Sequence, residues 1–352
     1  MKVYHIGLLL GYMTLFQIII VSKCEEDTLS DISDILTSFR NWISGSNKSV
    51  IFLLMYTRES NSPIKLDLPI KNNSLLRGKI SKEKPLVLII HGFISDGEEK
   101  WTKELVQAYL KRKDAVVGVV DWSSTAKTIN YFDAVDAVPN VADQLIRFIK
   151  LLIKEFQVKP KNIHIIGHSL GAHIAGNVGK GIASIHRITV NFHFSGLDPA
   201  GIGFIDQSST VLSLSKTDAT FVDVAHTNSI LGNFQLLGSV DFFINDNDRI
   251  QPGCNQTNDQ DTHFYHKIKH HECSHRLAIH YFIESINNSK CLFVASETKE
   301  RANKIFSKDF DPKRDTVLGL DTFKYKARGK LYITTNKFSP YCRNTSSNSN
   351  CD

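Results

Sequence analysis

Residues 162–176, which read NIHIIGHSLGAHIAG, limit the possible folds more than any other part of the sequence. An apolar run up to Gly167 indicates a buried parallel strand, and helical character begins at Ala172. Ser169 lies between them, with a glycine two residues to either side. This is the pattern of a nucleophile elbow, a strained turn at which side chains on Gly167 and Gly171 would collide with the neighbouring strand and helix. The alternative is a glycine-rich strand–helix turn in which the serine has no chemical role.

Strands and helices alternate through the first half of the chain. Buried strands are predicted at 50–56, 85–90, 115–120, 188–195 and 221–225, and helices at 101–112 and 141–156. This order predicts an α/β protein with a mostly parallel central sheet and helices on both faces. Active sites of such sheets lie at the carboxyl ends of the strands, which is where His91, Ser169 and Asp198 fall. After residue 226 the pattern loosens, with a helix predicted at 274–287 and one alternating stretch at 330–334.

The first residues predict export from the cell. Met-Lys is followed by an apolar run from Ile6 to Val21 and then by the small residues Ser22 and Cys24. The run is shorter than the ~20 apolar residues of a membrane span, so residues 1–24 are predicted to be a secretory signal peptide. No later stretch is long and apolar enough to cross a bilayer. We therefore expect a secreted, soluble single domain over 25–352, with a mobile tail from about residue 344.

The cysteines and the glycosylation sequons are consistent with secretion. The six cysteines are expected to be mostly paired in an oxidising compartment. If Cys24 leaves with the signal peptide, one of the remaining five is free or pairs between chains. Five Asn-X-Ser/Thr sequons begin at Asn47, Asn72, Asn255, Asn287 and Asn344.

The net charge of +6 is concentrated in one region, because residues 299–330 hold ten Lys/Arg against five Asp/Glu. A solvated basic face is one interpretation, and a contact surface for anionic lipids is the other. Nucleic acid is not an expected partner, because the basic residues accompany no nucleic-acid-binding motif.

A serine nucleophile needs a base, and the base needs an orienting acid. His275 is the best base, since a disulfide at the neighbouring cysteine would fix its loop. Asp198 is the best acid, because it lies just past a strand end in a Gly/Pro-bounded turn, while Asp121 and Asp223 are rivals at other strand ends. The order Ser169, Asp198, His275 is that of α/β-hydrolases. His164 and His173 are too close to the elbow in sequence and are expected to pack in the core.

Two backbone N–H groups are predicted to form the oxyanion hole. One belongs to Leu170, the residue after the nucleophile, and the other to Phe93, just past a strand end. Phe93 could equally be a core aromatic residue. A zinc site is conceivable among the six histidines from His263 to His280, but the missing acid and cysteine geometry favours structural or solvated histidines. No metal or cofactor is therefore predicted.

Taken together, these segments resemble the pancreatic-lipase-like family of animal lipases. The matching stretches are HGF at 91–93, VVDW at 119–122, IGHSLGAHIAG at 166–176, GLDPAG at 196–201, FVDVAHT at 221–227, QPGC at 251–254 and CSH at 273–275. The resemblance implies an α/β-hydrolase fold with nucleophile Ser169, acid Asp198 and base His275, and with Phe93 and Leu170 at the oxyanion hole. It also implies that a disulfide between Cys254 and Cys273 ties down a lid.

Two differences from the family members that hydrolyse triacylglycerol point to one branch of that family, the secreted insect phospholipases A1. The segment between the lid cysteines has only Phe264, Tyr265 and Ile268 as large apolar residues, and the loop at 228–240 is short. The chain after His275 is too short for a C-terminal β-sandwich. We therefore expect a monomeric phospholipase A1 acting on a phospholipid or lipid aggregate surface. The alternatives are a neutral-lipid (triacylglycerol) lipase and a non-catalytic, yolk-like lipid-binding protein. Residues 208–216 lack the acidic side chains that hold structural calcium in pancreatic lipases.

Overall fold

The computed structural model describes residues 50–343, except residues 61, 72, 187–192, 206–210, 247–249, 255–263 and 289. The expected signal peptide and the tail from residue 344 lie outside the described residues. So do four of the five predicted glycosylation sites, Asn47, Asn72, Asn255 and Asn344. The fifth, Asn287, is exposed.

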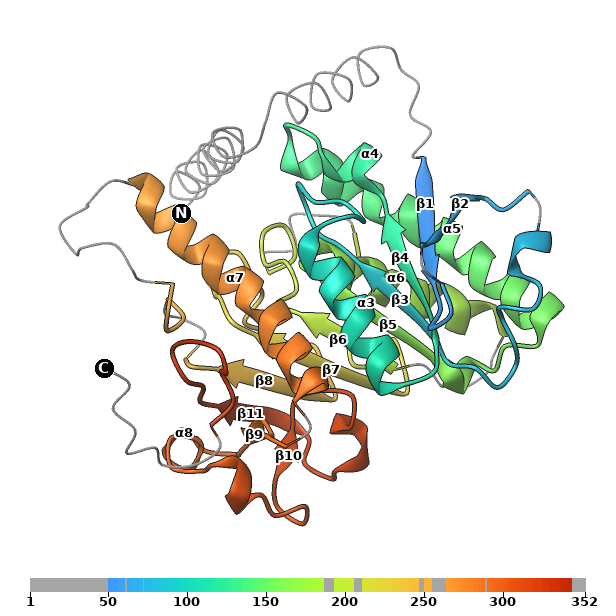
Figure 1. Cartoon of the computed structure of the whole chain (residues 1–352). Helices are drawn as coiled ribbons and strands as arrows, with labels where there is room; N and C mark the ends of the chain where they lie inside the picture. The colour runs from blue at the N-terminus through green and yellow to red at the C-terminus, as the bar shows by residue number, and fades with distance from the viewer. Residues whose placement is uncertain are drawn as a thin grey trace.

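A nine-stranded sheet runs through the described part of the chain (Figure 1). Its strands are β1 (Ile51–Tyr56), β2 (Ile64–Leu68), β3 (Leu86–Ile90), β4 (Val116–Asp121), β5 (Ile163–His168), β6 (His193–Leu197), β7 (Phe221–His226), β8 (Val240–Ile244) and β11 (Gly329–Ile333). The spatial order is β11-β8-β7-β6-β5-β3-β4-β1-β2. All neighbours from β11 to β4 are parallel, whereas β1 is antiparallel to both β4 and β2. The predicted mostly parallel sheet is confirmed.

Helices cover both faces of this sheet. The α-helices are α3 (Lys100–Arg112), α4 (Ser123–Ala126), α5 (Tyr131–Phe156), α6 (Leu170–His186), α7 (Phe264–Asn287) and α8 (Lys299–Ala302). Helices α3 and α7 pack together on one face, and α5 and α6 pack together on the other (Figure 1). A small second sheet pairs β9 (Val294–Ala295) with β10 (Thr316–Val317). Short 3-10 helices occupy Ser74–Leu76, Pro160–Asn162, Ser307–Asp309 and Thr322–Lys324.

Strand β3 shows how the sequence builds the two cores. All five of its residues are buried and apolar, but alternate side chains point to opposite faces. Leu86, Leu88 and Ile90 join the core beneath α5 and α6, whereas Val87 and Ile89 join the core beneath α3 and α7. Because both faces are covered, the strand reads as a continuous apolar run rather than as an alternating one.

The structure corrects the predicted bounds of two helices and adds strands β2, β8, β9 and β10. Helix α5 begins at Tyr131 rather than at 141, with the Asn130 side chain accepting a hydrogen bond from the Phe132 N–H as its cap. Helix α7 begins at Phe264 rather than at 274, so His275 lies within a helix and not in a loop. Strand β8 was not predicted. No helix among the described residues is long and apolar enough to span a membrane.

Candidate active site

Ser169 lies on the sharp turn between β5 and α6. Its φ is 56°, which is strained for a non-glycine residue, and its N–H donates to the carbonyl of Leu197 on the next strand at 3.1 Å. A Cβ on Gly167 would lie 2.3 Å from the carbonyl oxygen of Gly171. A Cβ on Gly171 would lie 2.2 Å from the carbonyl oxygen of Ile90. Both glycines are therefore required by close backbone approach, as the elbow pattern predicts.

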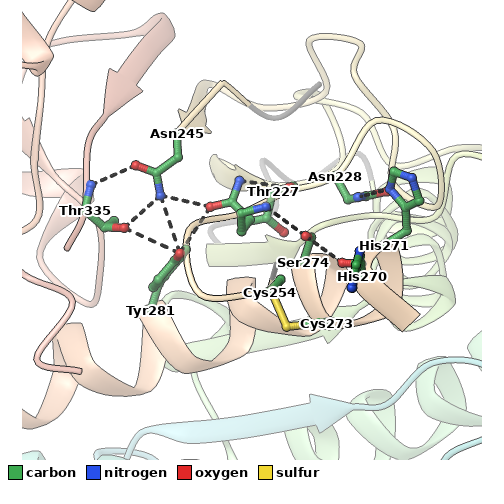
Figure 2. The surroundings of a disulfide bond; sticks show 11 residues. Thr227, Asn228, Asn245, Cys254, His270, His271, Cys273, Ser274, Tyr281 and Thr335 are labelled. Carbon is green, nitrogen blue, oxygen red and sulfur yellow. Dashed lines mark hydrogen bonds between the residues drawn. A yellow bond between two sulfur atoms is a disulfide. The ribbon is translucent and has the colours of Figure 1, made fainter. Parts of the chain in front are cut away.

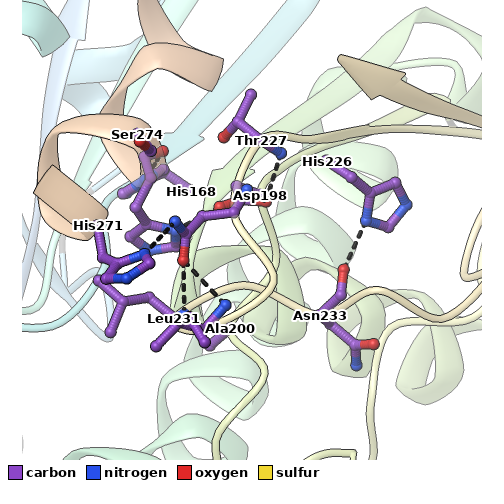
Figure 3. Close-up of polar contacts among 12 residues, drawn as sticks. His168, Asp198, Ala200, His226, Thr227, Leu231, Asn233, His271 and Ser274 are labelled. Carbon is purple, nitrogen blue, oxygen red and sulfur yellow. Dashed lines mark hydrogen bonds and ion pairs between the residues drawn. The ribbon is translucent and has the colours of Figure 1, made fainter. Parts of the chain in front are cut away.

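Asp198 follows the carboxyl end of β6 and is fully buried. Its Oδ1 accepts a hydrogen bond from the N–H of Thr227 at 2.8 Å (Figure 3) and another from the N–H of Asn228 at 3.3 Å. Its Oδ2 lies 2.6 Å from Nδ1 of His275 on α7. An ionised carboxylate can only accept, so Nδ1 carries the proton and Nε2 is left with a lone pair. This pairing holds the imidazole in the form that can act as a base.

Ser169 and His275 line the same cleft, which opens to solvent. Among the described residues, no hydrogen bond joins the Ser169 hydroxyl to the imidazole. Such bonds are commonly longer without substrate and tighten in the Michaelis complex. The cleft wall is apolar at Phe93, Trp101, Tyr131, Leu231 and Ile279, and charged at Glu99, Glu272 and Arg276.

The segment after β3 closely approaches the serine. A Cβ on Gly92 would lie 2.7 Å from Cβ of Ser169, so only glycine permits this contact. The ring of His91 fixes the turn, because one nitrogen lies 2.9 Å from the Gly92 carbonyl and the other accepts the Trp122 N–H at 3.2 Å. Phe93 lines the cleft, and Leu170 is the first residue of α6. The two predicted oxyanion donors therefore belong to segments that flank Ser169 directly.

His168, which the sequence analysis did not single out, packs against His275. Its ring centroid is 4.6 Å from that of His275, and its Nε2 lies 3.3 Å from the His275 carbonyl oxygen. Burial holds the pKa of His168 well below its usual range. The neighbour of His275 is thus kept neutral and adds no positive charge beside the imidazole.

The rival acid Asp223 belongs to a second hydrogen-bonded Ser–His–Asp set. The Ser195 hydroxyl donates to Oδ1 of Asp223 at 3.0 Å and lies 2.9 Å from Nε2 of His164. His193 Nε2 reaches the same carboxylate oxygen at 2.5 Å. Neither Ser195, His164 nor Asp223 lines the cleft.

The order of contacts distinguishes the two sets. In the second set the serine lies between the acid and the histidine, and its proton goes to the carboxylate. A catalytic arrangement needs the histidine between the other two, so that the imidazole takes the serine proton. His164 is also buried, which lowers its pKa well below its usual range. As predicted, His164 packs in the core, and so does His173. The other rival, Asp121, accepts the Ser123 N–H at 2.9 Å and lies near His91.

A disulfide joins Cys254 to Cys273 at the carboxyl edge of the sheet (Figure 2). Beside it, Ser274 Oγ donates to the His270 carbonyl at 2.8 Å and accepts the Gln251 N–H at 2.9 Å. The Gln251 amide in turn donates to the carbonyls that follow β7 and end β8, Thr227 and Ile244. These contacts attach α7, and with it His275, to the sheet.

A second disulfide joins Cys291 to Cys342, a pairing that the sequence analysis left open. The two remaining cysteines, Cys24 and Cys351, lie outside the described residues. No group of three or more His, Cys, Asp or Glu side chains that could hold a metal occurs in the described part of the chain. Part of the histidine-rich stretch, 261–263, is not among the described residues.

The first half of α7 packs on the loop between β7 and β8. Ile268 is buried against Leu231 of that loop and Ile202. The Asn228 amide nitrogen lies 2.9 Å from Nδ1 of His271 (Figure 2). At the end of β7, a ring nitrogen of His226 lies 2.6 Å from the carbonyl oxygen of Asn233 in the loop (Figure 3). The β7–β8 loop, whose Leu231 lines the cleft, is thus held by α7 and by the end of β7.

A parallel sheet with a strained serine at a strand–helix turn, facing an Asp–His pair at the carboxyl edge, defines an α/β-hydrolase with the features of a serine esterase. Comparison with known proteins refines this class. The sequence matches the family described as Lipase over residues 20–341, and the chain belongs to that family.

Its relatives include proteins named phospholipase A1 from insects. Over 85% of this chain it is 32% identical to "Phospholipase A1" of Polybia paulista, covering 91% of that protein. It is equally 32% identical to "Phospholipase A1 4" of Polistes dominula, covering 92% of it. Among solved structures, an α/β hydrolase from a Medee basin deep-sea metagenome library matches 53% of this chain and 73% of its own, at 14% identity and a TM-score of 0.30.

Proposed function

We propose that this protein is a secreted phospholipase A1, which hydrolyses the sn-1 acyl ester of glycerophospholipids through an acyl-enzyme on Ser169. The observation that carries the proposal is the buried Asp198–His275 pair, whose histidine lines the same cleft as the strained serine. The names of the curated relatives and the short β7–β8 loop support the phospholipid substrate. Two disulfides and the predicted signal peptide support export. We expect the enzyme to act as a monomer on a lipid aggregate surface.

The proposed chemistry follows from the geometry. Oγ of Ser169 attacks the sn-1 carbonyl carbon while Nε2 of His275 takes its proton. Asp198 stabilises the resulting imidazolium through Nδ1. The N–H groups of Phe93 and Leu170 stabilise the oxyanion, and losing one such donor typically costs ~10²–10³ in turnover.

The ester is then cleaved and the enzyme regenerated in two stages, each with its own tetrahedral intermediate. His275 returns the proton to the departing glycerol oxygen, which releases a lysophospholipid that keeps its sn-2 chain. Water, deprotonated by His275, attacks the acyl-enzyme, and the second tetrahedral intermediate releases the fatty acid as His275 returns the proton to Oγ of Ser169. The resting Ser169 and His275 are restored, so protons and charges balance without any cofactor.

The two serines of the two Ser–His–Asp sets provide the test. Ser169→Ala is expected to lower kcat by at least ~10⁴ and to abolish labelling by a fluorophosphonate. Ser195→Ala is the matched control and should keep both activity and labelling. Hydrolysis is measured on mixed micelles of phosphatidylcholine with distinguishable sn-1 and sn-2 chains, and only sn-2 lysolipid should accumulate.

Three results would contradict the proposal. Hydrolysis of triolein without hydrolysis of phosphatidylcholine would favour a neutral-lipid lipase. Absence of both labelling and hydrolysis in the wild-type protein would favour a lipid-binding protein. Loss of labelling in Ser195→Ala but not in Ser169→Ala would move the nucleophile to the other set.

A further inference from the structure

One face of α7 carries charge into the cleft. Glu272, His275, Arg276 and Ile279 all line it, at the three- and four-residue spacing of a single helix face. Arg276 directly follows the proposed base in the sequence, and both side chains line the cleft. The surrounding wall is otherwise mostly apolar, which makes these charges the groups that can recognise a polar part of a substrate.

Arg276 forms an ion pair with Glu99, an acidic residue at the start of α3. Its Nη2 donates to Oε2 of Glu99 at 3.3 Å, and Oε1 of Glu99 accepts the Ser95 hydroxyl at 3.3 Å. Glu99 is the N-cap residue of α3, so this ion pair joins α3 to α7. The Arg276 side chain is 37% exposed and that of Glu99 19%. A guanidinium has five N–H donors, so this single bond leaves others for a ligand.

We infer that Arg276 and Glu272 recognise the headgroup of a zwitterionic glycerophospholipid, with Arg276 binding the phosphate and Glu272 the ammonium group. This inference rests on the proposed function. Only a glycerol backbone separates the sn-1 ester from the phosphate, and only one peptide bond separates His275 from Arg276. The planar guanidinium fork matches phosphate oxygens, and Glu99 positions it.

The carboxylates of Glu272 and Glu99 determine which phospholipid headgroup the site prefers. Glu272 and Glu99 both line the cleft near Arg276, so a second anionic group beyond the phosphate would be repelled. An ammonium group there would be attracted. The site therefore favours phosphatidylcholine or phosphatidylethanolamine, whose headgroups carry an ammonium group, over phosphatidylglycerol, whose headgroup carries none. It also favours these zwitterionic phospholipids over an uncharged ester of similar reactivity.

The test uses monomeric substrates, so that binding to a lipid surface does not enter. The full-length secreted protein is assayed on dihexanoylphosphatidylcholine and dihexanoylphosphatidylglycerol below their micelle concentrations, and on p-nitrophenyl butyrate. Arg276→Gln should lower kcat/KM for phosphatidylcholine, relative to that for the butyrate, by about tenfold. Arg276→Lys keeps the charge and should lose less. Glu272→Gln should lower the phosphatidylcholine-to-phosphatidylglycerol ratio by about fivefold.

Arg147→Gln is the matched control, because it breaks a surface ion pair with Asp143 on α5 outside the cleft. It should leave both ratios unchanged. If Arg276→Gln lowers kcat/KM equally for phosphatidylcholine and the butyrate, Arg276 only fastens α7 to α3, and the inference is wrong while the proposed esterase stands. If the wild-type protein cleaves the butyrate but neither phospholipid, the proposed phospholipase activity fails and this inference fails with it.

Discussion

Asp198 and Asp223 are both buried carboxylates beside a histidine, yet their surroundings assign them different tasks. Asp198 directs one oxygen to two backbone N–H groups and the other to Nδ1 of His275. Asp223 directs one oxygen to both Ser195 and His193, away from the cleft. The first carboxylate is therefore placed to orient the proposed base, whereas the second satisfies polar groups within the sheet.

Substituting each acid by its amide should separate these tasks. Asp198→Asn is expected to lower kcat by ~10⁴, because the amide no longer selects the imidazole tautomer that leaves Nε2 as a base. Asp223→Asn is expected to leave kcat per folded molecule within about threefold but to lower the free energy of unfolding by about 2–4 kcal/mol, because the buried network loses its charge partner. Active-site titration combined with urea unfolding measures both quantities. The reverse pattern would assign catalysis to Asp223.

Single residues differ in how far their positions could be predicted from the sequence. Ser169 and Asp198 follow strand ends, and parallel strand ends meet at one edge of the sheet, so their proximity followed from the order of elements. The partnership of Ser195 with Asp223 depends on strand register, which a sequence pattern does not fix. The Arg276–Glu99 pair depends on where α7 crosses the start of α3, and no local pattern encodes that crossing.

The turn between β5 and α6 depends on contacts that exclude even a methyl group. A Cβ on Gly171 would meet the carbonyl oxygens of Ile90 and His91 at 2.2 and 2.7 Å. Both contacts are with backbone, which cannot move aside as a flexible side chain could. The first turn of α6 and the end of β3 are thus fixed against each other at the site of the proposed oxyanion hole.

Gly171→Ala is accordingly expected to lower the free energy of unfolding by about 3 kcal/mol and to reduce activity in the folded fraction. Gly78→Ala is the control: its φ is +75°, but no atom lies within 4 Å of an added Cβ. Only the backbone penalty applies there, about 1–2 kcal/mol. Urea unfolding of both variants gives the comparison, and an equal loss in the two would argue against crowding at the elbow.

Two of the errors in the predicted elements, the missing strand β8 and the shortened helix α7, have identifiable causes. Strand β8 reads VDFFI, and its Asp241 interrupts the apolar run; in the structure this carboxylate is buried and accepts from Leu237 N–H and Gly238 N–H. His226 Nε2 lies 2.9 Å from the same carboxylate. The first half of α7 is rich in histidine and lysine, so it lacks the apolar periodicity that marks a helix. Tertiary contacts such as that of buried Ile268 define it instead.

Three buried histidines make the stability of the fold depend on pH. Burial lowers the pKa of His164 and His168 well below their usual range and that of His173 to about 4. Both nitrogens of His173 are already engaged, one near the Ala200 carbonyl at 2.8 Å and the other accepting the Leu214 N–H at 3.0 Å. A second proton would break the latter bond and place a charge in the core.

The free energy of unfolding is therefore expected to fall as the pH drops from about 6.5 towards 4. Over that interval the unfolded chain, with histidine pKa values near 6.5, binds more protons than the folded protein. His173 alone would contribute up to about 3 kcal/mol of this loss. Urea unfolding at pH 7 and pH 4.5 measures it, and His173→Gln should show a smaller difference between the two. An identical difference in wild type and variant would mean that other groups carry the effect.

Strand β11 is the last strand among the described residues, and it pairs in parallel with β8 along the full length of both. A disulfide joins Cys342, which follows β11, to Cys291, which follows α7. During synthesis the edge of β8 therefore has no partner until residues 329–333 have left the ribosome, and an unpaired strand edge readily captures other extended chains. We therefore expect a premature stop codon ahead of this segment to produce an aggregation-prone polypeptide, although every proposed catalytic residue has already been translated.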